Sequence, residues 1–308
     1  MNRPILLAGP TASGKSELAL ALAERFGGAV INADSQQVYR DWRILTARPG
    51  PGDVARAPHF LYGHVSLDAE YSVGTWLAEV EGILNACRAQ GLRPIITGGT
   101  GLYFKALTEG LAPIPQIPPD VRAEAEESLE RMGLTAFADA LDARDGETMA
   151  TIDRANPMRL LRAWEVLEAT GMGLAGWRRR TPPPLLPLRN CVALVLDPPR
   201  DWLHARCDAR FDAMIRTGVM DEVRRVRDLG LDTDLPGMKA VGAPELRSYL
   251  DGTLNLGEAV ARAKTATRRY AKRQSTWIRN QMFQWTVLSG HDPAENLAIA
   301  TDLAAKPG

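Results

Sequence analysis

Eight consecutive residues near the amino terminus have the types and spacing of a phosphate-binding loop: Gly9-Pro10-Thr11-Ala12-Ser13-Gly14-Lys15-Ser16. They match the pattern G-x-x-x-x-G-K-[ST], in which backbone N–H groups surround phosphate oxygens, the lysine reaches the terminal phosphate and the last hydroxyl holds Mg²⁺. The pattern therefore predicts a di- or triphosphate site and assigns the metal to Ser16. The predicted diphosphate contacts are Gly9, Thr11, Ala12, Ser13, Gly14, Lys15 and Ser16.

A carboxylate and a second glycine loop are further candidates for chemistry. Asp34 begins the segment Asp34-Ser35-Gln36-Gln37-Val38-Tyr39-Arg40, and a carboxylate at the end of a strand can ligate Mg²⁺, act as a general base or cap a turn. The amides of Gln36 and Gln37 can pair with the edge of a nucleic-acid base. Thr100 lies in Gly98-Gly99-Thr100-Gly101, although such glycines also permit an ordinary tight turn.

Two groups of basic residues could contact a nucleic acid. Arg159 and Arg162 are three residues apart on a predicted helix and share a face; for such a pair taken alone, an ordinary salt-bridged surface is the default interpretation. A longer segment contains seven basic residues and no acidic one: Arg262, Lys264, Arg268, Arg269, Lys272, Arg273 and Arg279. We expect this segment to form a helix with an uncompensated basic face, which suits contact with a phosphate backbone.

The elements that must position these residues alternate between strand and helix. Short apolar runs predict buried strands at residues 4–8, 29–33, 94–97 and 191–196. Apolar residues at helical spacing predict helices at residues 17–26 and 74–90. This alternation indicates an α/β fold with a P-loop-type parallel sheet flanked by helices, whose ligands lie at the carboxyl ends of the strands. The phosphate loop, Asp34 and Thr100 should then face one crevice.

A change of composition near Leu111 marks a second region. Prolines at positions 113, 115, 118 and 119 precede a helix-rich stretch that ends near a second proline run at 182–184. Asn156 followed by Pro157 is a typical helix start within it. We therefore expect an α/β core of residues 1–111 and 191–308, interrupted by a small helical insertion of residues 112–190.

The overall composition limits the classes of protein to be considered. The 308 residues include 37 Lys plus Arg and 37 Asp plus Glu, so a nucleic acid would have to bind a local basic patch. Three scattered cysteines and four histidines argue against a zinc site and a disulfide framework. We find no apolar run of membrane-spanning length and no leader-like segment. These features predict a cytoplasmic monomer without a membrane partner or an obligate protein partner.

Together these segments resemble the tRNA dimethylallyltransferase family. The shared motifs are GPTASGKS at residues 9–16, DSQQVYR at 34–40, TARP at 46–49, GGTGLY at 98–103, RLLRAWEV at 159–166 and AKRQSTWIR at 271–279. They span nearly the whole chain in the order of the family. The resemblance implies transfer of a dimethylallyl group from dimethylallyl diphosphate to the exocyclic amine of the adenine 3′-adjacent to the anticodon, which gives isopentenyladenosine. The phosphate loop would then hold the diphosphate of a prenyl donor, with Mg²⁺, rather than a nucleotide.

The resemblance also implies roles for individual residues. Asp34 would be the base, with Lys15 and Thr100 as further catalytic residues, and Arg210 would be a second diphosphate contact. The insertion would clamp the anticodon stem of the tRNA. The implied tRNA contacts are Ser35, Gln36, Gln37, Thr100, Arg122, Arg159, Arg162, Lys272 and Arg273.

Two departures from the family pattern and two rival functions remain. Ala243 and Pro244 replace a usual aromatic and basic residue, which removes a possible stacking surface for RNA. Leu45 stands where glycine is usual; we expect both changes to lie away from the diphosphate chemistry.

A small-molecule or nucleoside kinase that uses ATP explains the first forty residues equally well but not the basic segments. An RNA-binding protein gated by a nucleotide explains the basic segments but gives no task to Asp34.

Overall fold

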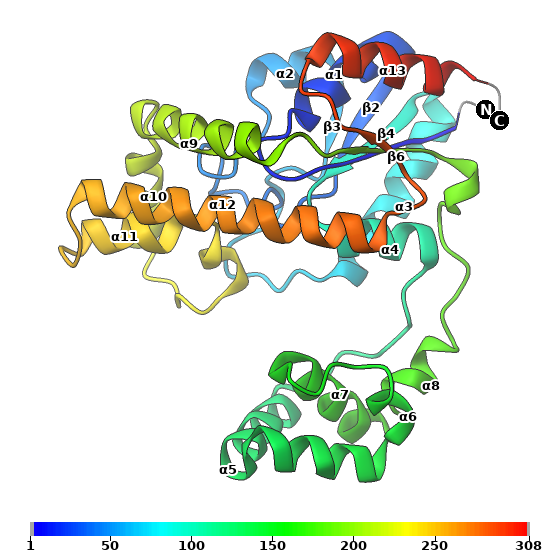
Figure 1. The fold of residues 1–308 in the computed structure, drawn as a ribbon, viewed down its shortest axis with the longest axis vertical. Coiled ribbons are helices and arrows are strands. Elements are labelled where there is room, and N and C mark those ends of the chain that lie inside the picture. Colours follow the sequence, from blue (N-terminus) through cyan, green and yellow to red (C-terminus); the bar gives the residue numbers. More distant parts are fainter. Residues whose placement is uncertain (1–2, 307–308) are drawn as a thin grey trace. The chain divides into compact units, whose positions relative to one another are not determined.

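The computed structural model describes residues 3–306, and these form two compact units (Figure 1). The first unit comprises Met1–Thr108 and Leu186–Gly308, and the second comprises Glu109–Leu185. The second unit is thus inserted into the chain of the first. Its bounds differ by three and five residues from the 112–190 expected from the proline clusters.

The amino-terminal part of the first unit alternates strands and helices. Its elements are β1 (Ile5–Ala8), α1 (Lys15–Phe26), β2 (Gly28–Asn32), α2 (Pro51–Arg56), β3 (His59–Phe60), α3 (Val73–Gln90), β4 (Arg93–Gly98) and α4 (Gly101–Glu109). After the insertion follow η1 (Leu188–Asn190), β5 (Val192–Leu196), α9 (Arg200–Arg216), α10 (Val219–Asp228), η2 (Pro236–Lys239), α11 (Ala243–Leu250), α12 (Leu256–Gln281), β6 (Thr286–Leu288) and α13 (Pro293–Ala305).

The six strands form one sheet in the order β3-β2-β4-β1-β5-β6, and every neighbouring pair is parallel. The central strand β1 pairs with β4 through Ile5↔Ile95 and with β5 through Ile5↔Val192. Strand β5, on the far side of the insertion, therefore returns to the sheet begun by β1. The predicted α/β fold with a parallel sheet is confirmed.

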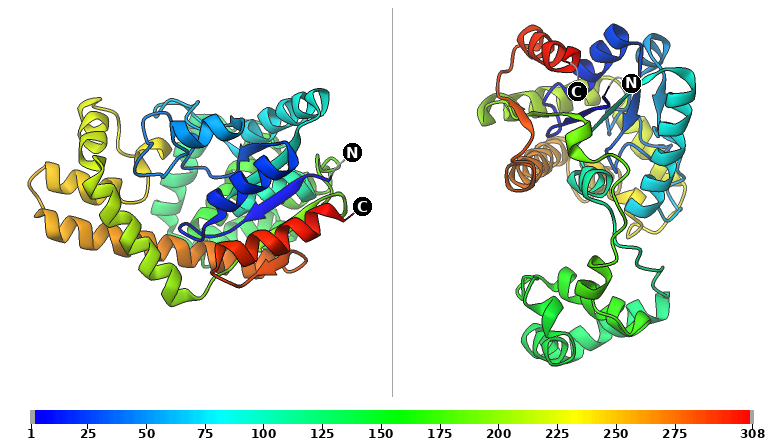
Figure 2. Two further views of the ribbon diagram at one scale, coloured as in Figure 1. Left: turned by 90° about the horizontal axis from the view of Figure 1, so that it is seen from above. Right: turned by 90° about the vertical axis from the view of Figure 1, so that its right-hand side faces the viewer.

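Helices cover both faces of this sheet. Leu18 and Leu22 of α1 and Ala300 of α13 pack on Ile5 and Leu7 of β1 in one hydrophobic cluster, and Figures 1 and 2 show α1, α2 and α13 over that face with α3 and α4 on the other. Burial of both faces explains why the strand segments read as continuous apolar runs rather than alternating ones. A further group of helices, α9 to α12, packs around a separate cluster that includes Phe211, Val223 and Leu246.

The second unit consists of helices alone in its described elements: α5 (Pro119–Arg144), α6 (Gly146–Met149), α7 (Pro157–Thr170) and α8 (Leu174–Arg178). Asn156 caps α7 by accepting the N–H of Arg159, as the sequence predicts. The unit has its own core, in which the rings of Phe137 and Trp164 stack with centroids 4.4 Å apart.

Candidate active site

The carboxyl ends of three adjacent strands meet where the site residues lie. The order β2-β4-β1 places the residues that follow Asn32, Gly98 and Ala8 at one edge of the sheet. Gly9 N–H donates to Gly98 at 3.2 Å, and Thr100 N–H donates to Ala33 at 3.1 Å. A Cβ at position 98 would lie 2.0 Å from the carbonyl oxygen of Ala33. Only glycine therefore allows β2 and β4 to end this close together.

The phosphate loop forms a cradle at this edge. Its backbone passes through positive φ angles at Ala12 (66°) and Gly14 (96°) before α1 begins at Lys15. The first N–H groups of a helix have no intrahelical acceptor and carry a partial positive charge, so the start of α1 is a site for an anion. The Ser13 hydroxyl is buried without a hydrogen-bond partner among the described residues, which is expected where a ligand supplies the partner.

Lys15 is held inside this cradle. Its side chain is buried, and Nζ lies 3.5 Å from the carbonyl oxygen of Pro10. Burial lowers the pKa of Lys15 to about 8; the nearby carboxylate of Asp34 acts in the opposite direction, and Arg210 lowers the pKa further. With this pKa most Lys15 side chains are charged at pH 7, and an anion in the cradle would raise the charged fraction further, because a nearby negative charge favours the charged form.

The structure brings Arg210 to the same loop, although 199 residues separate it from Thr11 in the sequence. Its guanidinium comes from α9 and donates a hydrogen bond to Oγ1 of Thr11. Burial lowers the pKa of Arg210, but an arginine remains charged in proteins. Two fixed cations, Lys15 and Arg210, therefore flank the phosphate loop.

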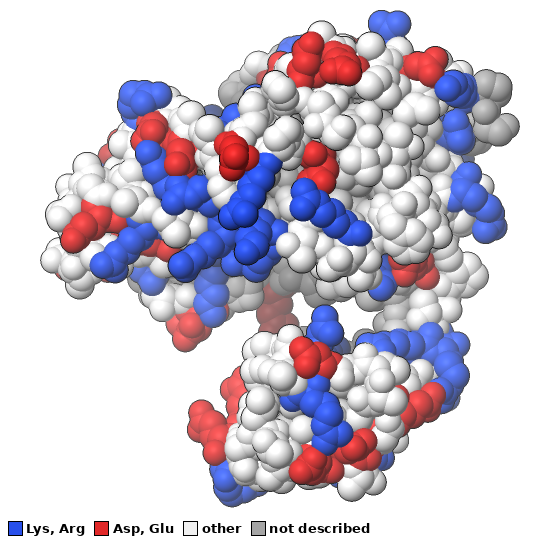
Figure 3. Space-filling model, in the orientation of Figure 1, with Lys and Arg blue, Asp and Glu red and all other residues white. Residues whose placement is uncertain are grey.

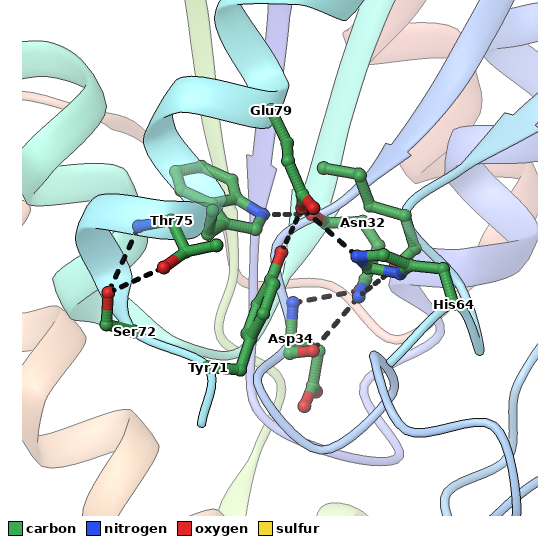
Figure 4. Close-up of polar contacts among 9 residues, drawn as sticks. Asn32, Asp34, His64, Tyr71, Ser72, Thr75 and Glu79 are labelled. Atoms are coloured by element: carbon green, nitrogen blue, oxygen red, sulfur yellow. Dashed lines mark hydrogen bonds and ion pairs between the residues drawn. The ribbon is translucent and has the colours of Figure 1, made fainter. Parts of the chain in front are cut away.

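Asp34 lies just beyond β2 and is almost fully buried (6% exposed). The Asn32 side chain fixes the backbone around it, since Oδ1 accepts the Asp34 N–H at 2.9 Å and Nδ2 donates to the Asp34 carbonyl at 3.0 Å (Figure 4). One carboxylate oxygen, Oδ1, accepts the N–H of Gln36 at 3.0 Å. Among the hydrogen bonds of residues 3–306 none engages Oδ2, so this oxygen can accept a proton from a substrate.

Thr100 supports the Asp34 turn from the neighbouring strand end. Its hydroxyl oxygen accepts the N–H of Ser35 at 2.8 Å and its proton is directed to the Ser35 hydroxyl at 3.1 Å. The structure therefore brings together Asp34 and Thr100, as expected from two strands that end at one edge.

A network behind Asp34 was not predicted from the sequence. Trp76 of α3 donates to the carbonyl oxygen of Asn32 at 2.8 Å. On the next turn of the same helix, Glu79 accepts the Tyr71 hydroxyl at 2.5 Å and contacts His64 at 3.1 Å (Figure 4). Trp76 thus anchors α3 to the strand end that precedes Asp34, and Glu79 ties the same helix to the loop that contains His64 and Tyr71. No motif marks them, because each is an ordinary residue type on a helix or loop.

The two glutamine amides expected at a base edge have partners within the protein. Nε2 of Gln37 donates to the carbonyl oxygens of Thr46 (2.8 Å) and Ala47 (3.0 Å), so both of its protons are used. Oε1 of Gln36 accepts the N–H of Val241 at 3.1 Å. The structure thus gives Gln37 the task of holding the 46–47 turn, and the Gln36 side chain also hydrogen-bonds the Tyr270 side chain at the edge of the site.

A cavity lined by both polar and apolar side chains lies beside these groups. Its polar lining includes Thr11, Asp34 and Arg210, and its apolar wall is made by Leu45, Phe211, Met214 and Val241. Its lining residues are Thr11, Asp34, Gln36, Leu45, Thr46, Cys207, Arg210, Phe211, Met214, Val241, Thr267 and Tyr270. Leu45, which we expect to lie away from the diphosphate chemistry, borders the same cavity as Thr11 and Arg210, and its distance from the diphosphate stays a prediction.

The basic helix α12 differs in part from the expectation. Three of its seven cations have acidic partners elsewhere: Lys264 with Asp212 (2.7 Å), Arg268 with Asp208 (2.5 Å) and Arg279 with Asp197 (2.9 Å). The prediction of an uncompensated face is therefore wrong for these three, because the partners lie far away in the sequence. Within residues 3–306 the other four form no ion pair and are exposed: Arg262, Arg269, Lys272 and Arg273. Basic side chains gather over α9 and α12 (Figure 3).

The remaining predicted tRNA contacts belong to the second unit. Arg122 lies exposed in the first turn of α5, and Arg159 lies exposed in the first turn of α7. Arg162 is half-buried and pairs with Glu165 at 3.3 Å. These three residues are therefore not among those that the first unit brings together around Asp34.

Comparison with known protein families agrees with this site. The family model described as IPP transferase matches residues 37–281, and the model described as isopentenyl transferase matches residues 3–59. A tRNA dimethylallyltransferase of Cereibacter sphaeroides is 56% identical over 284 residues, which cover 92% of this chain and 88% of the relative. The chain belongs to the tRNA dimethylallyltransferase family. A family member from a Ruegeria species is 53% identical over 289 residues, which cover 94% of this chain and 96% of the relative.

Solved structures agree with the assignment to this family. A tRNA isopentenylpyrophosphate transferase from Bacillus halodurans superposes with a TM-score of 0.71 at 31% identity, over 99% of this chain and 96% of that one. A eukaryotic dimethylallyltransferase, crystallised acting on tRNA, shares the fold with a TM-score of 0.83 at 24% identity, over 100% of this chain and 81% of that one. No helix within residues 3–306 is both long enough and apolar enough to span a membrane.

Proposed function

We propose that this chain transfers a dimethylallyl group from dimethylallyl diphosphate to the exocyclic amine of the adenine on the 3′ side of the anticodon in tRNA. The observation that carries this proposal is the cavity in which Thr11 and Arg210, the carboxylate of Asp34 and an apolar wall meet. A diphosphate ester of an apolar alcohol needs the anion-binding residues and the apolar wall, and the amine that accepts the dimethylallyl group needs the carboxylate.

The donor is proposed to bind with its diphosphate on the phosphate loop. Lys15 and Arg210 supply positive charge, and the loop and first turn of α1 supply the N–H groups of Ala12, Gly14 and Ser16. The N–H groups of Gly9, Thr11 and Ser13 already donate to Gly98, Gln274 and Pro10, so these three residues border the diphosphate without donating to it. The C–O bond of the donor breaks with its electron pair going to the diphosphate. Fixed cations and dipoles at that position stabilise the charge as it develops. The dimethylallyl group would lie against Leu45, Phe211 and Met214, on the apolar wall.

The acceptor nitrogen is proposed to lose its proton to Asp34. As the new C–N bond forms, the exocyclic amine becomes more acidic, and Oδ2 of Asp34 is the free acceptor. A positioned base of this kind typically contributes about 10²–10⁴-fold. Thr100 acts through Ser35 by holding the turn that contains Asp34. The products are isopentenyladenosine, diphosphate and a proton.

Mg²⁺ is proposed as the metal that accompanies the donor. The described residues contain no cluster of three or more His, Cys, Asp or Glu side chains suited to a metal ion. Ser16 is exposed at the start of α1, and Mg²⁺ commonly takes one or two protein oxygens together with substrate phosphates and water. The oxygen ligands present therefore fit a Mg²⁺ ion held by the Ser16 hydroxyl and the diphosphate. There the ion would neutralise charge on the leaving group.

The tRNA is proposed to contact both units through basic side chains, all of them exposed except the half-buried Arg162. Lys272 and Arg273 lie on α12 of the first unit, while Arg122, Arg159 and Arg162 lie on the second. Ser35 and Gln36 are at the edge of the cavity, where the target base would arrive. This base must leave the stack of the anticodon loop, which costs a few kcal/mol and is easiest for single-stranded bases.

The test is transfer of label from radiolabelled dimethylallyl diphosphate to an anticodon stem-loop RNA, with the purified chain alone because we propose that it needs no protein partner. Wild-type protein should label the RNA, and Asp34→Ala should reduce the rate by about 10²-fold or more. An unchanged rate in Asp34→Ala would leave the activity but remove Asp34 as the base. Phosphate transfer from ATP without RNA labelling would replace the proposal by a kinase.

A further inference from the structure

One buried side chain joins the phosphate loop to the second glycine loop. Gln274 of α12 is 6% exposed, and its Oε1 accepts the N–H of Thr11 at 2.8 Å. Its Nε2 donates to the carbonyl oxygen of Gly99 at 3.1 Å. The two contacts connect segments that are 263 and 175 positions away from Gln274 in the sequence. A single amide thus bridges two loops that belong to different strands.

The fit around this amide is tight on the glycine side. A Cβ at position 99 would lie 2.1 Å from Nε2 of Gln274 and 3.3 Å from the carbonyl oxygen of Gly9. Glycine at position 99 therefore leaves room for the amide, and a larger residue there would displace the end of the glutamine side chain.

Each end of the bridge leads to one half of the proposed reaction. On one side Thr11 accepts a hydrogen bond from Arg210 and belongs to the loop that holds the diphosphate. On the other side Gly99 precedes Thr100, which holds Ser35 and so the turn that begins with Asp34. The length of the Gln274 side chain thereby helps to set the distance between the diphosphate leaving group and the base, Asp34.

We propose that Gln274 is a positioning residue for the transfer reaction. It fixes the phosphate loop relative to the Asp34–Thr100 loops, and touches neither substrate. This inference rests on the proposed function. A displacement reaction depends steeply on the distance between the reacting atoms, and a misplacement of about 1 Å can cost about 10²-fold in rate. Without the amide, the N–H of Thr11 and the carbonyl of Gly99 lose their buried partners, and the two loops can relax away from each other.

The test compares two methionine substitutions on the same helix. Gln274→Met keeps the length of the side chain and removes both hydrogen bonds. The control, Gln281→Met, removes an exposed amide whose Oε1 accepts only a long 3.4 Å contact from Lys105. Rates are expressed per folded enzyme, from a thermal unfolding curve recorded under the assay conditions. We expect Gln274→Met to lower kcat about 10–100-fold with KM for the RNA within about twofold of wild type, and Gln281→Met to match wild type.

A second variant attacks the bridge from its other end. Gly99→Ala should displace the amide and reproduce the fall in kcat. The double variant Gln274→Met with Gly99→Ala should be no slower than the slower single variant, because both changes break one interaction. A general loss of stability would lower the folded fraction without producing this non-additivity.

Either of two outcomes would overturn the inference. The first is a kcat per folded enzyme of Gln274→Met within about twofold of wild type, and the second is additive losses of kcat in the double variant. Wild-type protein that labels no RNA would refute the proposed function instead. In that case the role of Gln274 is tested by the binding of inorganic pyrophosphate, which needs only the phosphate loop. Weaker binding by Gln274→Met than by Gln281→Met would support Gln274 as a positioning residue, and equal binding would overturn the inference.

Discussion

Raising the pH from 7 to 9 should weaken the binding of dimethylallyl diphosphate about tenfold in the absence of RNA. Burial lowers the pKa of Lys15 to about 8, so about nine tenths of the free protein carries a charged lysine at pH 7 and about one tenth at pH 9. The diphosphate requires the charged form, because Lys15 lies inside the loop that would hold it. The donor itself stays ionised over this range, since the last ionisation of a phosphate ester falls near pH 6.

The assay is isothermal titration of the donor into the protein with Mg²⁺ at pH 7, 8 and 9. At pH 8 the binding should also take up about half a proton per donor, measured by comparing buffers with different ionisation enthalpies. Lys15→Met is the control, and its weaker binding should no longer depend on pH. An affinity that stays constant between pH 7 and 9, or a Lys15→Met protein with the wild-type pH profile, would refute the reasoning.

The same buried lysine predicts how stability changes with pH. In the unfolded chain Lys15 keeps its proton up to its ordinary pKa of 10.5, whereas in the folded protein it releases it at about 8. Between these values the unfolded state binds more protons, so the lysine contributes a free energy of unfolding that rises with pH, by up to about 3 kcal/mol. Urea unfolding at pH 8 and pH 10 should show this rise relative to Lys15→Met; no difference in the two pH dependences would contradict it.

Three further predictions concern the base, the RNA surface and a buried carboxylate. Asp34→Asn should lower kcat about 10²-fold or more while donor affinity measured by titration stays within about threefold, since Asp34 accepts the proton but does not hold the diphosphate. Lys272→Ala and Arg273→Ala should each reduce the salt dependence of RNA binding by about one counterion, measured as the slope of log affinity against log salt; unchanged slopes would exclude phosphate contacts. Glu222→Ala should lower the free energy of unfolding by at least about 2 kcal/mol in urea, because three buried or partly buried N–H groups lose their acceptor; a smaller loss would mean that water replaces the carboxylate.

The sequence predicted the parts of the fold that depend on local signals. Continuous apolar runs identified the central strands, and the phosphate-loop pattern located the turn between β1 and α1. The parallel arrangement then placed Asp34 and Thr100 at one edge without any coordinates, because the carboxyl ends of parallel strands share an edge. The short strands β3 and β6 were missed, since two and three residues carry too little periodicity.

The sequence could not show which distant residues complete the site. Glu222 accepts three backbone N–H groups from residues 43–45, at distances of 2.6 to 2.9 Å, yet it lies about 180 positions away and looks like any acidic residue of a surface helix. Arg268 was counted as free because its partner, Asp208, lies on another helix. In each case the residue type is common and only the packing of α9, α10 and α12 gives it a specific partner.

Helix α12 contains the family motif at residues 271–279, which is distant from the phosphate loop in the sequence and has no residue with a proposed chemical role. One of its faces carries Gln274, which holds Thr11 and Gly99, and Ile278, which is buried. The other face exposes Lys272 and Arg273, which are two positions and one position before Gln274 in the sequence. A helix is stiff over such a short distance, so a phosphate contact at Lys272 or Arg273 and the amide at Gln274 share one rigid element. The segment 271–279 is therefore held on one face by the loops that Gln274 contacts and is proposed to bind RNA on the other, and the proposed reaction assigns no bond-making or bond-breaking step to its residues.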